Sequence, residues 1–358
     1  MAKDSNNKSA TTIYDIARHL NISPSTVSKA LSNKTTITSE TRKKVQNTAK
    51  LLNYTPNVAA RYLKTQKTNQ IMIVIPYVAD EFNIDVISAV QTIAKSNNYS
   101  LILEYTDEDF REEIEIIKKA NNNFIDGLIM VSMNFSKEHI KEISMLQIPA
   151  VLSSISNNVI EGGKGFFDYI GVDTKKGLYL STKHMIEQGH TKIGFIGIKQ
   201  GTQTGDERFK GFCLAMNESG LKINEEHIIM GKYSLEDAYE YGLIFAKMKN
   251  RPTAICASAD LIVLGLYRAF EQENISIPGD ISVIGMDNIN TTTLVRPKIS
   301  TVALSQDEIG RYAAELIFER IKGSVKPMQN IIFKPRLVIR DSSINLNKSR
   351  IKGGYTQT

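Results

Sequence analysis

The pattern of apolar and polar residues changes near Gln70, and the two parts of the chain predict different folds. Over residues 12–64, apolar side chains recur at helical spacing between short polar turns. After Gln70, short apolar runs typical of buried strands alternate with segments of helical periodicity. The runs cover residues 71–77, 100–105, 127–132, 150–155, 169–173, 193–197, 254–258 and 281–287. Because such runs suit strands buried on both faces, we expect doubly wound parallel sheets covered by helices.

The first part predicts a helix-turn-helix. Thr12 and Asp15 have the spacing of a capping box, and Ser23 can cap a second helix that has Pro24 at its first position. The second helix would begin about three or four residues after the first ends, which is the arrangement that places a recognition helix in the DNA major groove. A third helix is expected over about residues 38–52.

The outward face of the second helix is the candidate DNA-reading surface. Val27, Ala30 and Leu31 fall on the inward side of this helix. The outward residues are Ser25, Thr26, Ser28 and Lys29. Any short amphipathic helix exposes polar residues, so the pattern alone leaves an ordinary solvated face as the alternative.

The positive charge is concentrated in the first part of the chain. Residues 1–69 hold nine Lys and three Arg against Asp4, Asp15 and Glu40, a net charge of +9, so the remainder of this +6 chain carries −3. A basic module ahead of a mildly acidic body indicates that the module meets a polyanion while the body has another task. A solvated basic surface is the alternative.

The body of about 270 residues is larger than one such sheet usually supports. It would divide near Asp173 into two lobes, with a ligand cleft between them. We therefore predict a helix-turn-helix domain over 11–56, a hinge helix and linker over 57–69, and a two-lobed effector-binding and dimerisation domain over 70–341. The polar residues 342–358, which include Gly353 and Gly354, are predicted to be a disordered tail.

Several classes of protein are disfavoured by the sequence. No apolar run approaches the ~20 residues of a membrane-spanning helix, and the first ten residues are polar, which predicts a cytoplasmic protein without a secretory signal. An enzyme is the main alternative, but residues 162–165 lack phosphate-loop spacing, and His184 and His190 lack the spacing of a helical metal pair. An exported solute-binding protein is disfavoured by the basic module. We predict no cofactor, no metal site and no disulfide between Cys213 and Cys256.

Ordered motifs along the chain give a more specific indication. In the first part they are TIYDIA (12–17), SPSTVSKAL (23–31), TRKKV (41–45), LNYTPN (52–57) and ARYL (60–63); in the body they are DGLI (126–129), GH (189–190), RFKGF (208–212), IGMD (284–287) and PKISTV (297–302). This series resembles the lactose-repressor and galactose-repressor (LacI/GalR) family of bacterial transcription regulators over residues 12 to about 341. The resemblance implies a sequence-specific DNA-binding regulator, usually a repressor, with a periplasmic-binding-protein-like effector domain.

The resemblance also implies roles for individual residues in the DNA-binding part. Ser25 and Lys29 would read the major groove beside Pro24, and Lys29 could donate to guanine. The residues that match phosphate-contacting positions are Tyr14, Ser23, Thr26, Ser28 and Tyr54. The hinge helix would contact DNA through Asn57, Ala60, Leu63 and Lys64, with Leu63 as a minor-groove wedge. Because an isolated eight-residue helix is unstable, it should form only when two copies pair on DNA.

In the body, the resemblance places Asp173, Arg208 and Asp287 at the effector cleft, with Ser132 and Phe82 as weaker candidates. Arg with two carboxylates suits the hydroxyls of a sugar. Tyr77 is the sixth candidate for the effector cleft. Tyr77 and Ala259 stand where many relatives have hydrogen-bonding residues, which leaves the ligand class open. The partners implied are a pseudo-palindromic operator, a second copy of the chain, a sugar or sugar derivative, and, as a further candidate, a phosphorylated carrier-protein corepressor.

Overall fold

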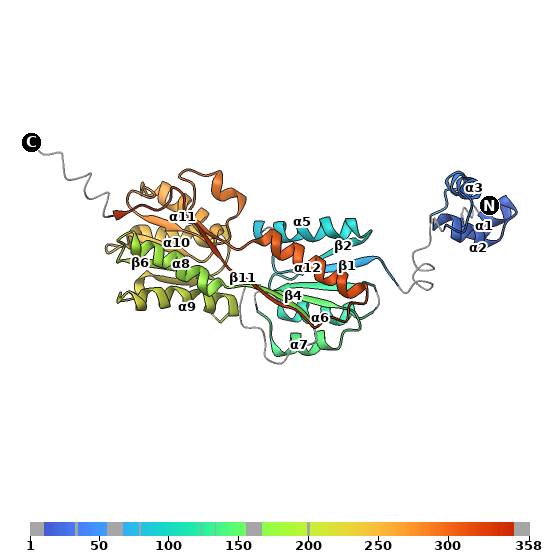
Figure 1. Ribbon diagram of the computed structural model, residues 1–358. Helices are drawn as coiled ribbons and strands as arrows, with labels where there is room; N and C mark the ends of the chain where they lie inside the picture. Colours follow the sequence, from blue (N-terminus) through green and yellow to red (C-terminus); the bar gives the residue numbers. More distant parts are fainter. Residues whose placement is uncertain are drawn as a thin grey trace, which may run out of the picture. The chain divides into compact units, whose positions relative to one another are not determined.

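The computed structural model of the protein describes residues 11–32, 35–55, 67–78, 80–122, 124–132, 134–154, 167–198 and 201–346. The chain forms two compact units, Met1–Thr68 and Asn69–Thr358, each with a core of its own (Figure 1). The predicted hinge residues Asn57, Ala60, Leu63 and Lys64 lie outside the described residues. None of the described helices combines the length and apolar character that crossing a lipid bilayer requires.

The first unit contains the three expected helices, α1 (Ile13–Leu20), α2 (Pro24–Leu31) and α3 (Ser39–Leu51). The Thr12 backbone N–H donates to the Asp15 carboxylate at 2.9 Å, and the Ser23 hydroxyl accepts from the Thr26 N–H at 3.1 Å. These caps satisfy backbone groups that the first turns of α1 and α2 leave unpaired. The helices enclose a small core formed by Ile16, Ala17, Val27, Ala30, Val45 and Ala49.

The first lobe of the second unit is a six-stranded parallel sheet of order β11-β5-β4-β3-β1-β2. Its strands are β1 (Gln70–Ile75), β2 (Ser100–Tyr105), β3 (Gly127–Ser132), β4 (Ala150–Ser154), β5 (Asp168–Val172) and β11 (Asn330–Phe333). Its helices are α5 (Glu81–Ser96), α6 (Phe110–Ala120), α7 (Lys137–Ser144) and α12 (Gln306–Ile321).

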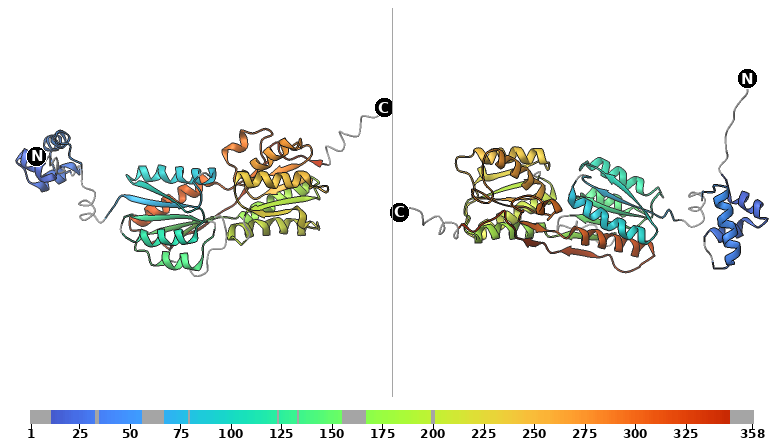
Figure 2. Two further views of the ribbon diagram at one scale, coloured as in Figure 1. Left: turned by 180° about the vertical axis from the view of Figure 1, so that it is seen from behind. Right: turned by 90° about the horizontal axis from the view of Figure 1, so that it is seen from above.

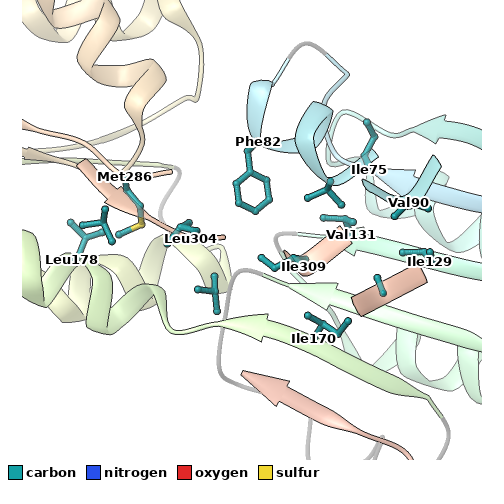
Figure 3. Packing of buried hydrophobic residues seen from close by; sticks show 14 of the residues in the cluster. Ile75, Phe82, Val90, Ile129, Val131, Ile170, Leu178, Met286, Leu304 and Ile309 are labelled. Carbon is teal, nitrogen blue, oxygen red and sulfur yellow. The ribbon is translucent and has the colours of Figure 1, made fainter. Parts of the chain in front are cut away.

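Alternate residues of the inner strands pack on opposite helix layers, as the two-residue side-chain period requires. Ile71, Ile73 and Ile75 of β1 pack with residues of α5 and α12, whereas Val74 packs with residues of α6 and α7. Figure 3 shows Ile75 near Phe82 and Val90 of α5. The inner strands of the sheet are therefore buried on both faces, which confirms the expected helix layers on each side, whereas the edge strands β2 and β11 are partly exposed.

The second lobe is a four-stranded parallel sheet of order β7-β6-β8-β9. Its strands are β6 (Ile193–Ile198), β7 (Ile228–Gly231), β8 (Ala254–Ala257) and β9 (Ser282–Ile284); its helices are α8 (Thr174–Glu187), α9 (Gln203–Glu218), α10 (Leu235–Lys247) and α11 (Asp260–Gln272). A side chain at Gly211 would meet the Lys175 carbonyl, so this glycine allows α9 to pack closely on α8.

The two lobes are not consecutive pieces of chain. After the second lobe is built, the chain returns to the first lobe to add α12 against α5 and β11 beside β5 (Figures 1 and 2). An antiparallel pair, β10 (Thr301–Ala303) and β12 (Arg336–Val338), accompanies this return. The predicted division near Asp173 locates the first crossing, between β5 and α8, but not the later ones.

The prediction that the tail is disordered from residue 342 was wrong for its first five residues. Ser342 is buried, its hydroxyl donates to the Val283 carbonyl at 2.7 Å, and the Ile344 carbonyl lies 3.3 Å from His190 Nε2. Polar composition misled the prediction, because these polar groups hydrogen-bond to the backbone and side chains of the second lobe. Residues 347–358 lie outside the described residues.

Candidate functional site

The polar face of α2 is arranged as the sequence predicts. Val27 and Ala30 are buried in the core, while Ser25 and Lys29, four residues apart and thus on one side of the helix, are exposed. Capping by Ser23 and the position of Pro24 at the start of the helix fix where this face begins. The helix therefore presents a short hydroxyl and a long cation from a rigid support.

The remaining DNA-contact candidates of the first unit are placed around this helix. Tyr14, on α1, is 63% exposed, and Tyr54 packs partly buried against the core that α2 and α3 share. Thr26 and Ser28 are on α2, where Thr26 is half-buried. The positions of these hydroxyls are compatible with phosphate contacts, which stay a prediction because no described contact tests them.

In the second unit, a small cavity lies where the two lobes meet. Its lining residues are Pro76, Asp80, Phe82, Asn83, Val131, Ser132, Arg208, Tyr233 and Asp287. Its volume is about 20 Å³, room for about one water molecule. We call it the inner cavity. Phe82, Ser132, Arg208 and Asp287, four of the six residues expected at the effector cleft, line it.

Arg208, from α9, is the central donor of the inner cavity. It is 2% exposed, its Nη1 donates to the Ser258 carbonyl at 2.5 Å, and its Nη2 lies 3.7 Å from Asp287 Oδ1. Its Nε and the Ser258 hydroxyl are buried, and neither finds a hydrogen-bond partner among the described residues. Because an unpaired buried polar group costs about 1–3 kcal/mol, the Nε of Arg208, which lines the inner cavity, is suited to a ligand that supplies the missing acceptor.

The carboxyl groups around Arg208 carry perturbed pKa values. Burial raises the pKa of Asp287 well above its usual range, although the nearby Arg208 opposes the shift. Burial likewise raises the pKa of Asp80, against a hydrogen bond from the Phe82 N–H and the charge of Arg208. Asp287 also has a φ of 114°, a conformation that non-glycine residues rarely adopt. Perturbed pKa values and backbone strain in one cleft are typical of functional sites.

A wider hollow, which we call the outer chamber, lies next to the inner cavity and shares Tyr233 with it. Its volume is about 290 Å³, and it is lined by Tyr77, Asp107, Glu108, Ile198, Thr202, Lys232, Tyr233, Ser234 and Asp237. The rings of Tyr77 and Tyr233, one from each lobe, lie 6.0 Å apart between centroids. Tyr77, the fifth of the expected cleft residues, therefore lines the outer chamber.

Asp173 is not among the described residues that line the inner cavity or the outer chamber. Asp173 caps α8, where its carboxylate accepts from the Lys176 N–H at 2.8 Å, and it faces an open surface hollow with Lys175 and Tyr179. An aspartate that follows a parallel strand can either face the cleft or cap the next helix, and here the free amides of α8 bind it.

Several cleft residues were missed by sequence reasoning, above all Asp80, Tyr233 and the outer-chamber acids. Asp80 caps α5, which is a readable signal for a helix start but not for a cavity. Ser132 has a further partner that sequence did not predict: its hydroxyl lies 3.3 Å from Glu113 Oε1, and Glu113 Oε2 lies 2.7 Å from His139 Nε2.

Glu81 and Thr291 join the lobes directly. Glu81 begins α5 in the first lobe, and Thr291 belongs to the short helix Asn290–Thr293 of the second lobe. The Thr291 hydroxyl donates to Glu81 Oε1, and the Thr291 N–H donates to Glu81 Oε2 at 3.3 Å. We call this pair the interlobe latch. The interlobe latch and the small inner cavity together show that the cleft between the two lobes is closed in this structure.

Comparisons with known proteins agree with both units. Residues 12–57 match the bacterial regulatory proteins of the lacI family, and residues 182–343 match a periplasmic binding protein-like domain. The chain is 32% identical over 338 residues to the HTH-type transcriptional repressor PurR of Photobacterium profundum, covering 94% of this chain and 99% of that protein.

Solved structures show the same fold. The lac repressor dimer bound to operator and the anti-inducer ONPF superimposes with a TM-score of 0.81 at 20% identity, covering 94% of this chain and all of that chain. A LacI family regulator from Enterococcus faecium with bound ribose gives a TM-score of 0.67 at 24% identity, covering 77% of this chain and 99% of the other. With a curated relative matched over nearly its whole length, the chain belongs to the lacI family of bacterial regulatory proteins and is a DNA-binding transcription regulator.

Proposed function

We propose that this regulator is a cytoplasmic, homodimeric repressor that binds a pseudo-palindromic operator. A small sugar-like effector would raise or lower its affinity for that operator. The observation that carries the effector site is the buried Arg208, whose Nε has no partner among the described residues and lies at the meeting of the two lobes. The relation to a phosphorylated carrier-protein corepressor rests on the family resemblance alone.

The groups around the inner cavity suit a hydroxylated ligand. Sugar hydroxyls both donate and accept hydrogen bonds, so Asp80 and Asp287 can accept hydrogen bonds from them while Arg208 donates hydrogen bonds to their oxygens. Phe82 supplies an apolar face. The Enterococcus faecium relative holds ribose, which supports this class of ligand.

Effector entry requires the lobes to part. The inner cavity has room for about one water molecule, so a sugar can reach Arg208 only when the interlobe latch opens. An effector that binds the closed and open arrangements unequally shifts the balance between them, typically by a coupling of about 1–3 kcal/mol. We propose that this shift reaches DNA through the hinge segment and its Leu63.

DNA reading is assigned to Ser25 and Lys29, with hinge contacts by Asn57, Ala60, Leu63 and Lys64. Two hinge segments, one from each subunit, would pair in the minor groove, which requires a dimer and a two-fold symmetric operator. No catalytic role is proposed, in keeping with relatives that are transcription regulators.

Selection of operators from random DNA, followed by binding assays with variants, tests this function. Lys29→Ala should lose about 1–3 kcal/mol of specific binding and relax preference at one base pair in each half-site. Lys44→Ala, which removes an exposed cation of the same unit that pairs with Glu40, is the matched control. Selected sites without two-fold symmetry, or equal losses for Lys29→Ala on specific and random DNA, would contradict the assignment.

A further inference from the structure

The charge of the cleft indicates which class of effector it accepts. Among the described residues that line the outer chamber, three carboxylates, those of Asp107, Glu108 and Asp237, accompany one cation, Lys232. In the inner cavity two carboxyl groups, Asp80 and Asp287, accompany Arg208. With these groups ionised, the described lining of the outer chamber carries a net charge of −2, and the inner cavity adds no net positive charge when at least one of its two carboxyl groups is ionised.

Local structure fixes the positions of the three acids that line the outer chamber. Asp107 and Glu108, which follow β2, are consecutive non-glycine residues in the left-handed region, with φ of 47° and 61°. Such residues cost free energy and cluster at functional sites. Asp237 is fixed by the Ser234 hydroxyl, which donates to its Oδ2 at 2.6 Å. The carboxylates are thus positioned on both lobes, on opposite sides of the same chamber.

The pKa of Tyr77 reflects the same negative charge. Burial, followed by the charge of Glu108 and a hydrogen bond to it, raises the pKa of Tyr77, and the charges of Asp107 and Asp80 act in the same direction. Tyr77 and Tyr233 also bring aromatic rings to the chamber lining, and aromatic rings attract cations as well as apolar sugar faces. A phosphate or carboxylate entering this chamber would face carboxylates from both lobes, and a like charge at close range is unfavourable.

Resting on the proposed function, we infer that the effector is a neutral or amine-bearing hydroxylated molecule, with any amine in the outer chamber, and that phosphorylated and carboxylated sugars are excluded. Arg208 does not reverse this selection, because Asp287 lies 3.7 Å from its Nη2 and the Ser258 carbonyl accepts from its Nη1. Its unpartnered Nε needs an acceptor, which a sugar hydroxyl provides without a negative charge.

The test uses thermal-shift titrations of the full-length protein with matched sets of sugars. Glucose, galactose, mannose and ribose are each compared with an amino form and a phosphate form, and uronic acids are added where they exist. The expected result is that binding occurs among neutral or amino members, and that the phosphate of a binding sugar binds at least tenfold more weakly.

Two variants test whether a preference among neutral, amino and phosphate forms of a sugar comes from the outer chamber. The double variant Asp107→Asn, Asp237→Asn should weaken an amino sugar about tenfold, change its neutral parent less than threefold, and reduce the penalty on the phosphate. Glu236→Gln, an exposed acid beside Asp237 on α10 but outside the chamber lining, is the matched control and should change none of these affinities.

Two outcomes would overturn the inference: a phosphate or uronic acid that binds as well as its neutral counterpart, or a panel in which no neutral or amino member binds. Operator binding is measured in parallel by mobility shift. Loss of specific DNA binding would count against the proposed function, whereas an effector response from an anionic sugar alone would count only against the charge selection.

Discussion

Removing the Thr291 hydroxyl should open the cleft without unfolding either lobe. In the closed structure this hydroxyl donates to Glu81 Oε1, and the backbone N–H of the same residue donates to Oε2 at 3.3 Å. A hydrogen bond to a charged acceptor contributes about 1.5–3 kcal/mol, and partial exposure of both residues reduces this to about 1–2 kcal/mol for Thr291→Val. Since 1.4 kcal/mol is tenfold, closure should weaken by about 5- to 30-fold.

Hydrogen exchange of the amide at position 291 measures this opening directly. The Thr291→Val variant keeps the amide, so its protection should fall by about the same factor as closure, while the thermal midpoint changes little. Thr293→Val is the matched control, because its hydroxyl donates to the Asn290 carbonyl at 2.9 Å within the second lobe. Unchanged protection at position 291, or an equal loss in both variants, would refute the latch.

Two further predictions concern the inner cavity and its surroundings. Arg208→Ala should abolish the effector response in a mobility-shift assay and leave operator binding intact, because Arg208 lies in the second unit and the reading helix in the first; normal effector affinity would remove Arg208 from the site. Burial raises the pKa of Asp260 to about 7, so the folded state holds this proton more tightly than the unfolded state, and stability should fall as pH rises from about 4 to about 7. Chemical denaturation at pH 5 and pH 7.5 should show a smaller fall for Asp260→Asn than for the parent, and equal falls would contradict the assignment.

Sequence reasoning located the elements whose signals are local. The strands over 100–105 and 127–132 were predicted with their observed bounds, and the caps by Asp15 and Ser23 form as expected. Apolar runs and capping residues depend on neighbours within a few positions, so a single sequence contains them.

The features that were missed depend on distant parts of the chain. Strands β7 and β11 are short and only partly buried, so their apolar runs are weak, and β11 is defined by pairing with β5. Tyr233 and Asp80 line one cavity only because the lobes meet there. Asp173 illustrates the difference, because its cap on α8 is a local feature, whereas its place at the cleft stays a prediction.

The return of the chain to the first lobe has a consequence for synthesis on the ribosome. Most of the second lobe is the stretch from α8 to the short helix Asn290–Thr293, whereas the first lobe is complete only when β11 has been made, about 260 residues after its sheet begins. Until α12 emerges, the apolar side of β3 and β4 that it covers, including Ile129 and Val151, lacks part of its final shelter. The first lobe should therefore stay incomplete until late in synthesis although its residues come first, and during that interval the nascent chain should be a substrate for chaperones that bind exposed apolar strands.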